Sequence, residues 1–299
     1  MLGGVAVAFA LLGEVLNTYF DVWVDADLGY LKFVVNRVFG VMSNYGFVPV
    51  PMFIFMGYML DKSEIAKELL RVLQMAMGSV PGGLALAVTA IGVVLAASTG
   101  IIGASVVLLT TLALPTMLKD RYSPVLATGT VAASGTLGIL IPPSIMLILM
   151  ADQMNLSVGD LFMGAVFPGL ILAGLYALYI VTFAMFRPSA APPMPKEQRD
   201  VPLATLLGLL AKALAPPVFL IFAVLGSIFL GVASPSEAAG VGAFGATLLA
   251  AAYGKLNLQT MREVCYATAK TTAFIVGAII GATAFAVVLR GVGGDQVIE

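Results

Sequence analysis

Long stretches without a charged residue constrain this chain more than any other feature. A membrane-spanning helix needs roughly 20 consecutive apolar residues. Six uncharged runs fit one crossing each, at residues 38–60, 122–151, 161–186, 213–236, 238–254 and 271–289, and residues 1–20 form a further candidate interrupted only by Glu14. The sequence therefore predicts an all-α integral membrane protein that crosses the bilayer several times.

Composition excludes most soluble functions. Only 10% of the residues are charged and 60% are hydrophobic, whereas soluble domains carry about 25% charged residues. The net charge of −1 offers no basic surface for nucleic acid. The chain has no histidine, which is the usual general base, and its one cysteine, Cys265, cannot form an intrachain disulfide. We therefore predict that the protein is not an enzyme and has no resident cofactor.

One uncharged run is too long for a single helix. It covers 47 residues, 72–118, and contains two apolar limbs, 81–97 and 104–118, around the small-residue tip STGIIG at 98–103. At 1.5 Å per residue, each limb reaches roughly 22–25 Å, which is less than the ~30 Å hydrocarbon core. We predict a re-entrant helical hairpin with its tip near the middle of the membrane. Two short spanning helices are the alternative.

The distribution of Lys and Arg predicts the orientation. If the hairpin adds no net crossing and the N-terminus lies inside, only three of the fifteen Lys and Arg residues fall outside, namely Lys32, Arg37 and Arg290. This is a strong positive-inside bias. It does not decide between the two hairpin interpretations, because one crossing with inverted topology still places eleven of these residues inside and four outside.

A proline pair interrupts the uncharged run at residues 122–151. Pro142 and Pro143 lack amide hydrogens, so the carbonyls of Gly138 and Ile139 lose their helical partners. Free backbone groups cannot face lipid and must face protein, water or an ion. We predict two half-helices whose facing ends suit a small hard cation and a carboxylate. A cation there would need neutral oxygens, which favours Na⁺ over a transition metal. A plain proline kink is the alternative.

These residues resemble the large membrane subunit of TRAP (tripartite ATP-independent periplasmic) transporters. The similarity runs along essentially the whole chain, and its matching segments are FIFMG at 53–57, AASTGIIGAS at 96–105, GTLGILIPPS at 135–144, SVGDLF at 157–162 and PSEAAGVGA at 235–243. The small-residue hairpin followed by GILIPPS is the most specific part. The resemblance implies an inverted-repeat elevator-type transporter fold with a re-entrant helical hairpin and a broken helix.

The resemblance also implies a function. Members of this family import organic acids in symport with Na⁺, the coupling ion, and receive them from a periplasmic solute-binding protein. The expected partners are that binding protein, a small four-helix membrane subunit on another chain, the organic-acid (carboxylate) substrate and membrane lipid. The expected location is the cytoplasmic (inner) membrane of a bacterium or archaeon, as a multi-pass protein. An uncoupled channel or pore-like protein is the alternative, because channels also use re-entrant loops.

Candidate site residues follow from the family by position. The family's sodium ligands are mostly main-chain carbonyls, and they fall on Thr99 and Ile102 in the tip, with Ser98 beside them, and on Gly138, Ile141 and Pro142 in the break. The proline argument selects Gly138 as well. Many relatives have small polar residues where this chain has Ile101 and Ile102, a change that only a main-chain ligand tolerates. Thr136 and Ser144 are candidate substrate-binding residues, although hydroxyls in membrane helices often bond their own backbone.

The expected organisation has six parts. Residues 1–60 form scaffold helices, 61–79 an amphipathic helix in the inner interface, 80–160 the hairpin and broken helix, and 161–186 the helix that closes the first repeat. Residues 187–212, which begin with a proline-rich stretch, form a cytoplasmic linker. Residues 213–299 begin a second inverted repeat. Because no second Pro-Pro break follows, and Pro216-Pro217 is expected at the start of a span, we expect this repeat to be incomplete and the sequence to be a fragment or a truncated gene.

Overall fold

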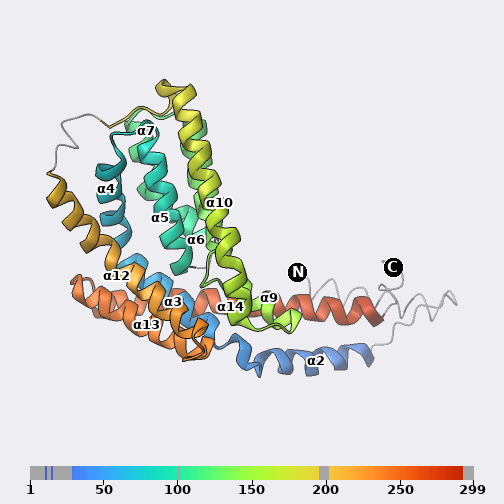
Figure 1. The fold of residues 1–299 in the computed structure, drawn as a ribbon. Coiled ribbons are helices and arrows are strands. Elements are labelled where there is room, and N and C mark those ends of the chain that lie inside the picture. Colours follow the sequence, from blue (N-terminus) through green and yellow to red (C-terminus); the bar gives the residue numbers. More distant parts are fainter. Residues whose placement is uncertain (1–10, 12–14, 16–28, 100–101, 195–201, 292–299) are drawn as a thin grey trace. The chain divides into compact units, whose positions relative to one another are not determined.

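The computed structural model describes residues 11, 15, 29–99, 102–194 and 202–291 (Figure 1). Within these residues the regular structure is entirely helical, as predicted. The chain divides into two compact units, Met1–Tyr45 with Ala269–Glu299, and Gly46–Thr268. The first unit contains α2 (Gly29–Met42) and the C-terminal part of α14 (Leu258–Gly291).

The second unit carries most of the helices. After the 3₁₀ turn η1 (Tyr45–Phe47), its elements are α3 (Pro49–Lys62), α4 (Ile65–Met77), α5 (Gly83–Thr99), α6 (Ile102–Leu112), α7 (Leu114–Lys119), α8 (Pro124–Thr136), η2 (Leu137–Ile139), α9 (Ile145–Met154), α10 (Val158–Phe186), η3 (Pro188–Ala190), α12 (Leu203–Phe229) and α13 (Pro235–Ala252). Within this unit α5 contacts α4, α8 and α10, and α3 packs along α13. In Figure 1 α5 and α10 lie side by side.

Small residues allow the close packing of α13. A Cβ atom placed on Gly242 would lie 2.8 Å from the sulfur of Met56 on α3, and one on Gly245 would lie 2.5 Å from Leu220 on α12. A side chain at either position would overlap these neighbours, because protein interiors are closely packed. Gly242, within PSEAAGVGA at 235–243, and Gly245 therefore serve helix packing.

Length and composition identify the helices that can cross a membrane. Among the described residues, three qualify, Val158–Phe186, Ala204–Phe229 and Leu258–Arg290, and α2 with α3 would make a fourth if the pair forms one broken span. The hairpin limbs and the two halves of the broken helix are shorter apolar helices. α13 is not among these helices, so its length and composition do not support the single crossing predicted at 238–254.

The uncharged run at 38–60, predicted to make one crossing, does not form one continuous helix. The chain ends α2 at Met42, makes the turn Tyr45–Phe47, and starts α3 at Pro49. Proline is tolerated in the first turn of a helix but cannot continue a preceding one. The uncharged run is continuous here, whereas the helix is not.

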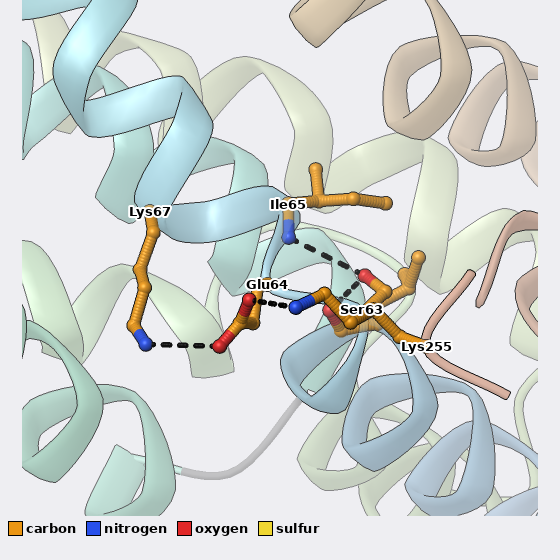
Figure 2. A network of polar contacts seen from close by, with 6 residues as sticks. Ser63, Glu64, Ile65, Lys67 and Lys255 are labelled. Atoms are coloured by element: carbon orange, nitrogen blue, oxygen red, sulfur yellow. Dashed lines mark hydrogen bonds and ion pairs between the residues drawn. The ribbon is translucent and has the colours of Figure 1, made fainter. Parts of the chain in front are cut away.

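The amphipathic helix begins later than the predicted residue 61. α3 continues to Lys62, and Ser63 and Glu64 form a turn before α4. The buried Ser63 hydroxyl donates to the Leu60 carbonyl at 2.5 Å and accepts from the Ile65 amide at 3.4 Å, while Glu64 adopts a left-handed conformation with φ 58° (Figure 2). α4 is amphipathic, as predicted for 61–79, since Ile65, Leu69, Leu70 and Leu73 are buried and Lys67 and Arg71 are exposed.

The predicted linker at 187–212 is too long. α12 begins at Leu203 and contains Lys212, because lysine ends an uncharged run but favours a helix. Pro216 and Pro217 consequently lie inside α12, and not at its start. The first residues of the linker form backbone hydrogen bonds with earlier segments of the second unit. The Ala190 carbonyl accepts from Ser123 N–H at 2.8 Å, and the Ala191 carbonyl accepts from Gly82 N–H at 3.0 Å.

Candidate functional site

The helix at residues 122–151 is interrupted where the proline pair predicts. α8 ends at Thr136, the single 3₁₀ turn η2 follows, and α9 begins only at Ile145. The peptide bond between Pro142 and Pro143 is cis. Residues 140–144 thus separate two half-helices, and the alternative of a plain kink in a continuous helix is excluded.

The carbonyl groups before the prolines differ in their partners. The Leu137 carbonyl accepts from the amides of Leu140 and Ile141, each at 3.0 Å. The Ile139 carbonyl accepts from the hydroxyl of Ser144 at 2.8 Å. No donor among the described residues reaches the carbonyl of Gly138, which is buried. A buried carbonyl normally has a partner, so the Gly138 oxygen is available to a ligand. The carbonyls of Ile141 and Pro142 likewise have no donor among the described residues.

Glycines hold the neighbouring helices close to the break. A Cβ atom on Gly92 of α5 would lie 2.9 Å from the Ser134 carbonyl oxygen, and one on Gly135 of α8 would overlap Val106 of α6. Gly169 of α10 faces the break itself, since a Cβ atom there would lie 2.9 Å from Ile141 Cγ1. The interruption is therefore enclosed by the two hairpin limbs and α10.

The predicted tip residues lie at the facing ends of the two limbs. Ser98 and Thr99 are the last residues of α5, and Ile102 is the first residue of α6 and is 38% exposed. Gly100 and Ile101, between them, lie outside the described residues, as do the side chains of Ser98 and Thr99. Both limbs contact η2. The structure thus brings the limbs to the break, while the distance from the tip to Gly138 stays a prediction.

The other predicted residues also lie at the break. Ile141 and Pro142 are buried between η2 and α9. Thr136 donates its hydroxyl proton to the Ala133 carbonyl at 2.7 Å, and Ser144, fully buried, donates to Ile139. Both hydroxyls therefore donate to backbone carbonyls, which is the alternative to substrate binding that the sequence left open. Because the Ser144 hydroxyl does not cap α9, the first amides of α9 have no side-chain partner there.

Sequence reasoning missed one polar contact beside the break. Ser134 of α8 donates its hydroxyl proton to Thr89 of α5 at 3.3 Å, and Thr89 donates to the Ala85 carbonyl at 3.0 Å. Both residues are buried. Hydroxyls within apolar runs were the available signal, but their pairing depends on which helices are adjacent.

Comparison with protein families gives a match along the chain. Residues 1–299 match the family described as tripartite ATP-independent periplasmic transporter, DctM component.

Curated relatives agree with this match. The C4-dicarboxylate TRAP transporter large permease protein DctM of Pseudomonas aeruginosa is 32% identical over 254 residues, which cover 85% of this chain and 58% of that protein. The protein of the same name from Vibrio cholerae is 34% identical over 249 residues, 81% of this chain and 51% of that protein. The sialic acid TRAP transporter large permease protein SiaM of Vibrio cholerae is 26% identical over 256 residues, 85% and 58% of the two chains. The chain spans less than two thirds of these three relatives.

Proposed function

Because this chain belongs to the DctM component family of tripartite ATP-independent periplasmic transporters, we propose that it acts in a Na⁺-coupled transporter that imports organic acids. The relatives are named as permeases for C4-dicarboxylates and sialic acid, so carboxylates are the substrate class that they support. We propose the cytoplasmic membrane as its location, where it would act as a multi-pass subunit. Its partners are a periplasmic solute-binding protein and a small membrane subunit.

The helix break carries this proposal. Pro142 and Pro143 remove two amide donors, the Ser144 hydroxyl bonds the Ile139 carbonyl, and the Gly138 carbonyl is left for a ligand. Main-chain oxygens are hard ligands that suit Na⁺. The C-terminal end of α8 adds partial negative charge at the same place. Na⁺ would bind here, with Ile141, Pro142 and the tip residues Ser98, Thr99 and Ile102 as further candidate ligands.

The substrate carboxylate would bind at the α9 side of the break. The N-terminus of α9 presents amide groups and partial positive charge. The Thr136 and Ser144 hydroxyls lie at either side of the break but are engaged with backbone carbonyls. The α9 amides are therefore better candidates for the carboxylate than these two hydroxyls.

An elevator movement agrees with the packing. α8 touches α5 and α6 through positions where a Cβ atom would overlap a neighbour, and Gly169 fixes α10 to the break in the same manner. Helices packed this tightly resist relative sliding. The group formed by α5, α6, α8, α9 and α10 would therefore move as one body and carry the ion with it.

Uptake by the complete complex in proteoliposomes tests the proposal. An inward Na⁺ gradient and the loaded binding protein should drive accumulation of a radiolabelled dicarboxylate. Gly138→Leu should reduce Na⁺-driven uptake by about tenfold, equivalent to ~1.4 kcal/mol, because it crowds the ligand carbonyl. Gly164→Leu on α10, where a Cβ atom meets nothing within 4 Å, is the matched control. Flux that ignores both the gradient and the binding protein would instead identify an uncoupled channel.

A further inference from the structure

A cavity of about 530 Å³ lies between α5, α8 and α10. Its volume is within the range of ligand pockets. Apolar and hydroxyl-bearing side chains line it, and no charged residue of the described chain does. Its lining residues are Thr89 of α5, six residues of α8 between Val125 and Ser134, and four residues of α10 between Tyr176 and Phe183. The cavity is therefore distinct from the helix break at 137–144.

Among the small hydroxyls that line this cavity, the Thr130 hydroxyl lacks a partner in the described residues. Thr130 is 6% exposed and lines the cavity, and its hydroxyl makes no hydrogen bond with any described residue. The other two small hydroxyls are engaged, since Ser134 donates to Thr89 and Thr89 donates to Ala85. A hydroxyl in an otherwise apolar cavity is stabilised by a hydrogen-bond partner. The cavity therefore suits a ligand that is mostly apolar and carries a hydrogen-bond acceptor.

The cavity opens sideways between α8 and α10. Val125 is 82% exposed and Tyr179 is 60% exposed, and both line it. A Cβ atom on Gly129 would meet nothing within 4 Å, so open space lies in front of this residue. For helices embedded in a bilayer, the medium beside such an opening is the acyl-chain region of the lipid.

Positive charge lies at one end of the cavity. The Arg187 guanidinium stands 5.9 Å from the ring centroid of Phe183, a lining residue. Ser123 N–H donates to the Ala190 carbonyl, which brings the start of α8 beside the segment that follows α10. Arg121 is two residues before Ser123. In the described part of the chain, neither arginine forms an ion pair.

We infer that this cavity binds one acyl chain of a membrane phospholipid whose anionic headgroup contacts Arg187 and Arg121. The spacing along α8 agrees with this ligand. Thr130 is six residues beyond Pro124, or about 9 Å along the helix, and the headgroup layer of one leaflet is roughly 5–8 Å thick. Thr130 therefore reaches the level of the ester carbonyls, which are the acceptors that its hydroxyl lacks. The inference requires the membrane setting of the proposed function, but neither Na⁺ nor a transported substrate.

Lipid retention by the purified chain tests this inference. Native mass spectrometry would follow palmitoyl-oleoyl phosphatidylglycerol, the matching phosphatidylcholine, and glycerol 3-phosphate as a free headgroup. The chain should retain phosphatidylglycerol in preference to phosphatidylcholine and should not retain glycerol 3-phosphate. Gly129→Leu should reduce retention about tenfold by filling the cavity. Thr130→Val should reduce it about threefold through the lost hydrogen bond.

Matched variants separate the cavity and headgroup contributions. Gly174→Leu on α10, where a Cβ atom also meets nothing within 4 Å, should leave retention unchanged. Arg187→Gln should abolish the preference for phosphatidylglycerol, whereas Arg71→Gln on the exposed face of α4 should preserve it. Equal retention by the Gly129→Leu and Gly174→Leu variants would overturn the inference, as would an unchanged headgroup preference in the Arg187→Gln variant. If the complex showed no Na⁺-driven uptake while the chain still retained phosphatidylglycerol, the proposed transport function would be contradicted and the lipid inference would stand.

Discussion

At the scale of single residues, Ser144 stabilises the helix break. Its hydroxyl replaces the amide that Pro143 cannot supply to the Ile139 carbonyl. Ser144→Ala leaves this carbonyl without a donor and should lower the free energy of unfolding by about 1–3 kcal/mol. Thermal unfolding in detergent would measure the loss.

Ser227→Ala is the control for Ser144→Ala. Ser227 donates to the Val224 carbonyl at 2.8 Å within α12. That carbonyl lies in a regular helix, where the amide four residues later remains as a donor. Removing the Ser227 hydroxyl should therefore lower the free energy of unfolding much less. Equal destabilisation by the two variants would contradict the role given to Ser144.

At the scale of helices, Gly135 determines how closely α6 approaches α8. A Cβ atom there would overlap the Val106 side chain and lie 3.1 Å from the Val106 Cα atom. Gly135→Ala should therefore lower the free energy of unfolding by about 1–3 kcal/mol. Adding Val106→Ala to this variant should restore part of the lost free energy of unfolding. A double-mutant cycle should give a coupling energy of about 0.5–3 kcal/mol between the two positions.

Gly129→Ala is the matched control on the same helix. A Cβ atom on Gly129 meets nothing within 4 Å, and alanine favours a helix over glycine by up to about 1 kcal/mol. This variant should be neutral or more stable than the wild type. If Gly135→Ala were equally neutral, the close packing of α6 on α8 would not be a source of stability.

Glu64 connects the turn between α3 and α4 to the loop between α13 and α14. Its carboxylate contacts Lys255 Nζ at 2.5 Å and Lys67 Nζ at 3.1 Å (Figure 2). These two hydrogen-bonded cations, Lys255 most of all, hold the pKa of Glu64 below its ordinary value of 4.5. A carboxyl with a lowered pKa in the folded state stabilises the fold above its unfolded pKa. This stability is lost as the pH falls through the folded pKa.

Glu64→Gln should consequently be less stable than the wild type at pH 7. The difference should shrink as the pH falls below about 4 and also at high salt, which screens exposed pairs. Unfolding curves across this pH range would measure it. Glu68→Gln, in the first turn of α4 and without an ion pair in the described residues, should show no such dependence, and an identical profile for both variants would refute the assignment.

The helix break could be predicted from sequence because its cause is local. Two consecutive prolines remove amide donors whatever surrounds them, and the structure interrupts the helix there. The first residues of α4 and α12 could not be predicted. The start of α4 depends on the left-handed conformation of Glu64 and on the hydrogen bonds of the buried Ser63 hydroxyl. The start of α12 lies before Lys212, although this charged residue interrupts the apolar pattern. The hydrogen-bond partner of Ser144 depends on the folded break, which the spacing of residues does not reveal.

At the scale of the whole molecule, three features account for the membrane-spanning fold and its candidate site. The uncharged runs give membrane-length helices, glycines pack α8 against α5 and α6, and the proline pair frees a carbonyl within that group. The chain spans about half the length of the DctM relatives from Pseudomonas aeruginosa and Vibrio cholerae. Transport is therefore a property to be measured in the complete complex, whereas ion binding at the break can be examined on this chain.

Anomalous diffraction from crystals containing Tl⁺, with and without excess Na⁺, tests the central claim most directly. We expect a Tl⁺ peak at coordination distance from the Gly138 carbonyl oxygen, beside the facing ends of α5 and α6, and we expect Na⁺ to remove it. The absence of a peak at this carbonyl, or a peak there that excess Na⁺ leaves unchanged, would contradict a sodium site at the helix break.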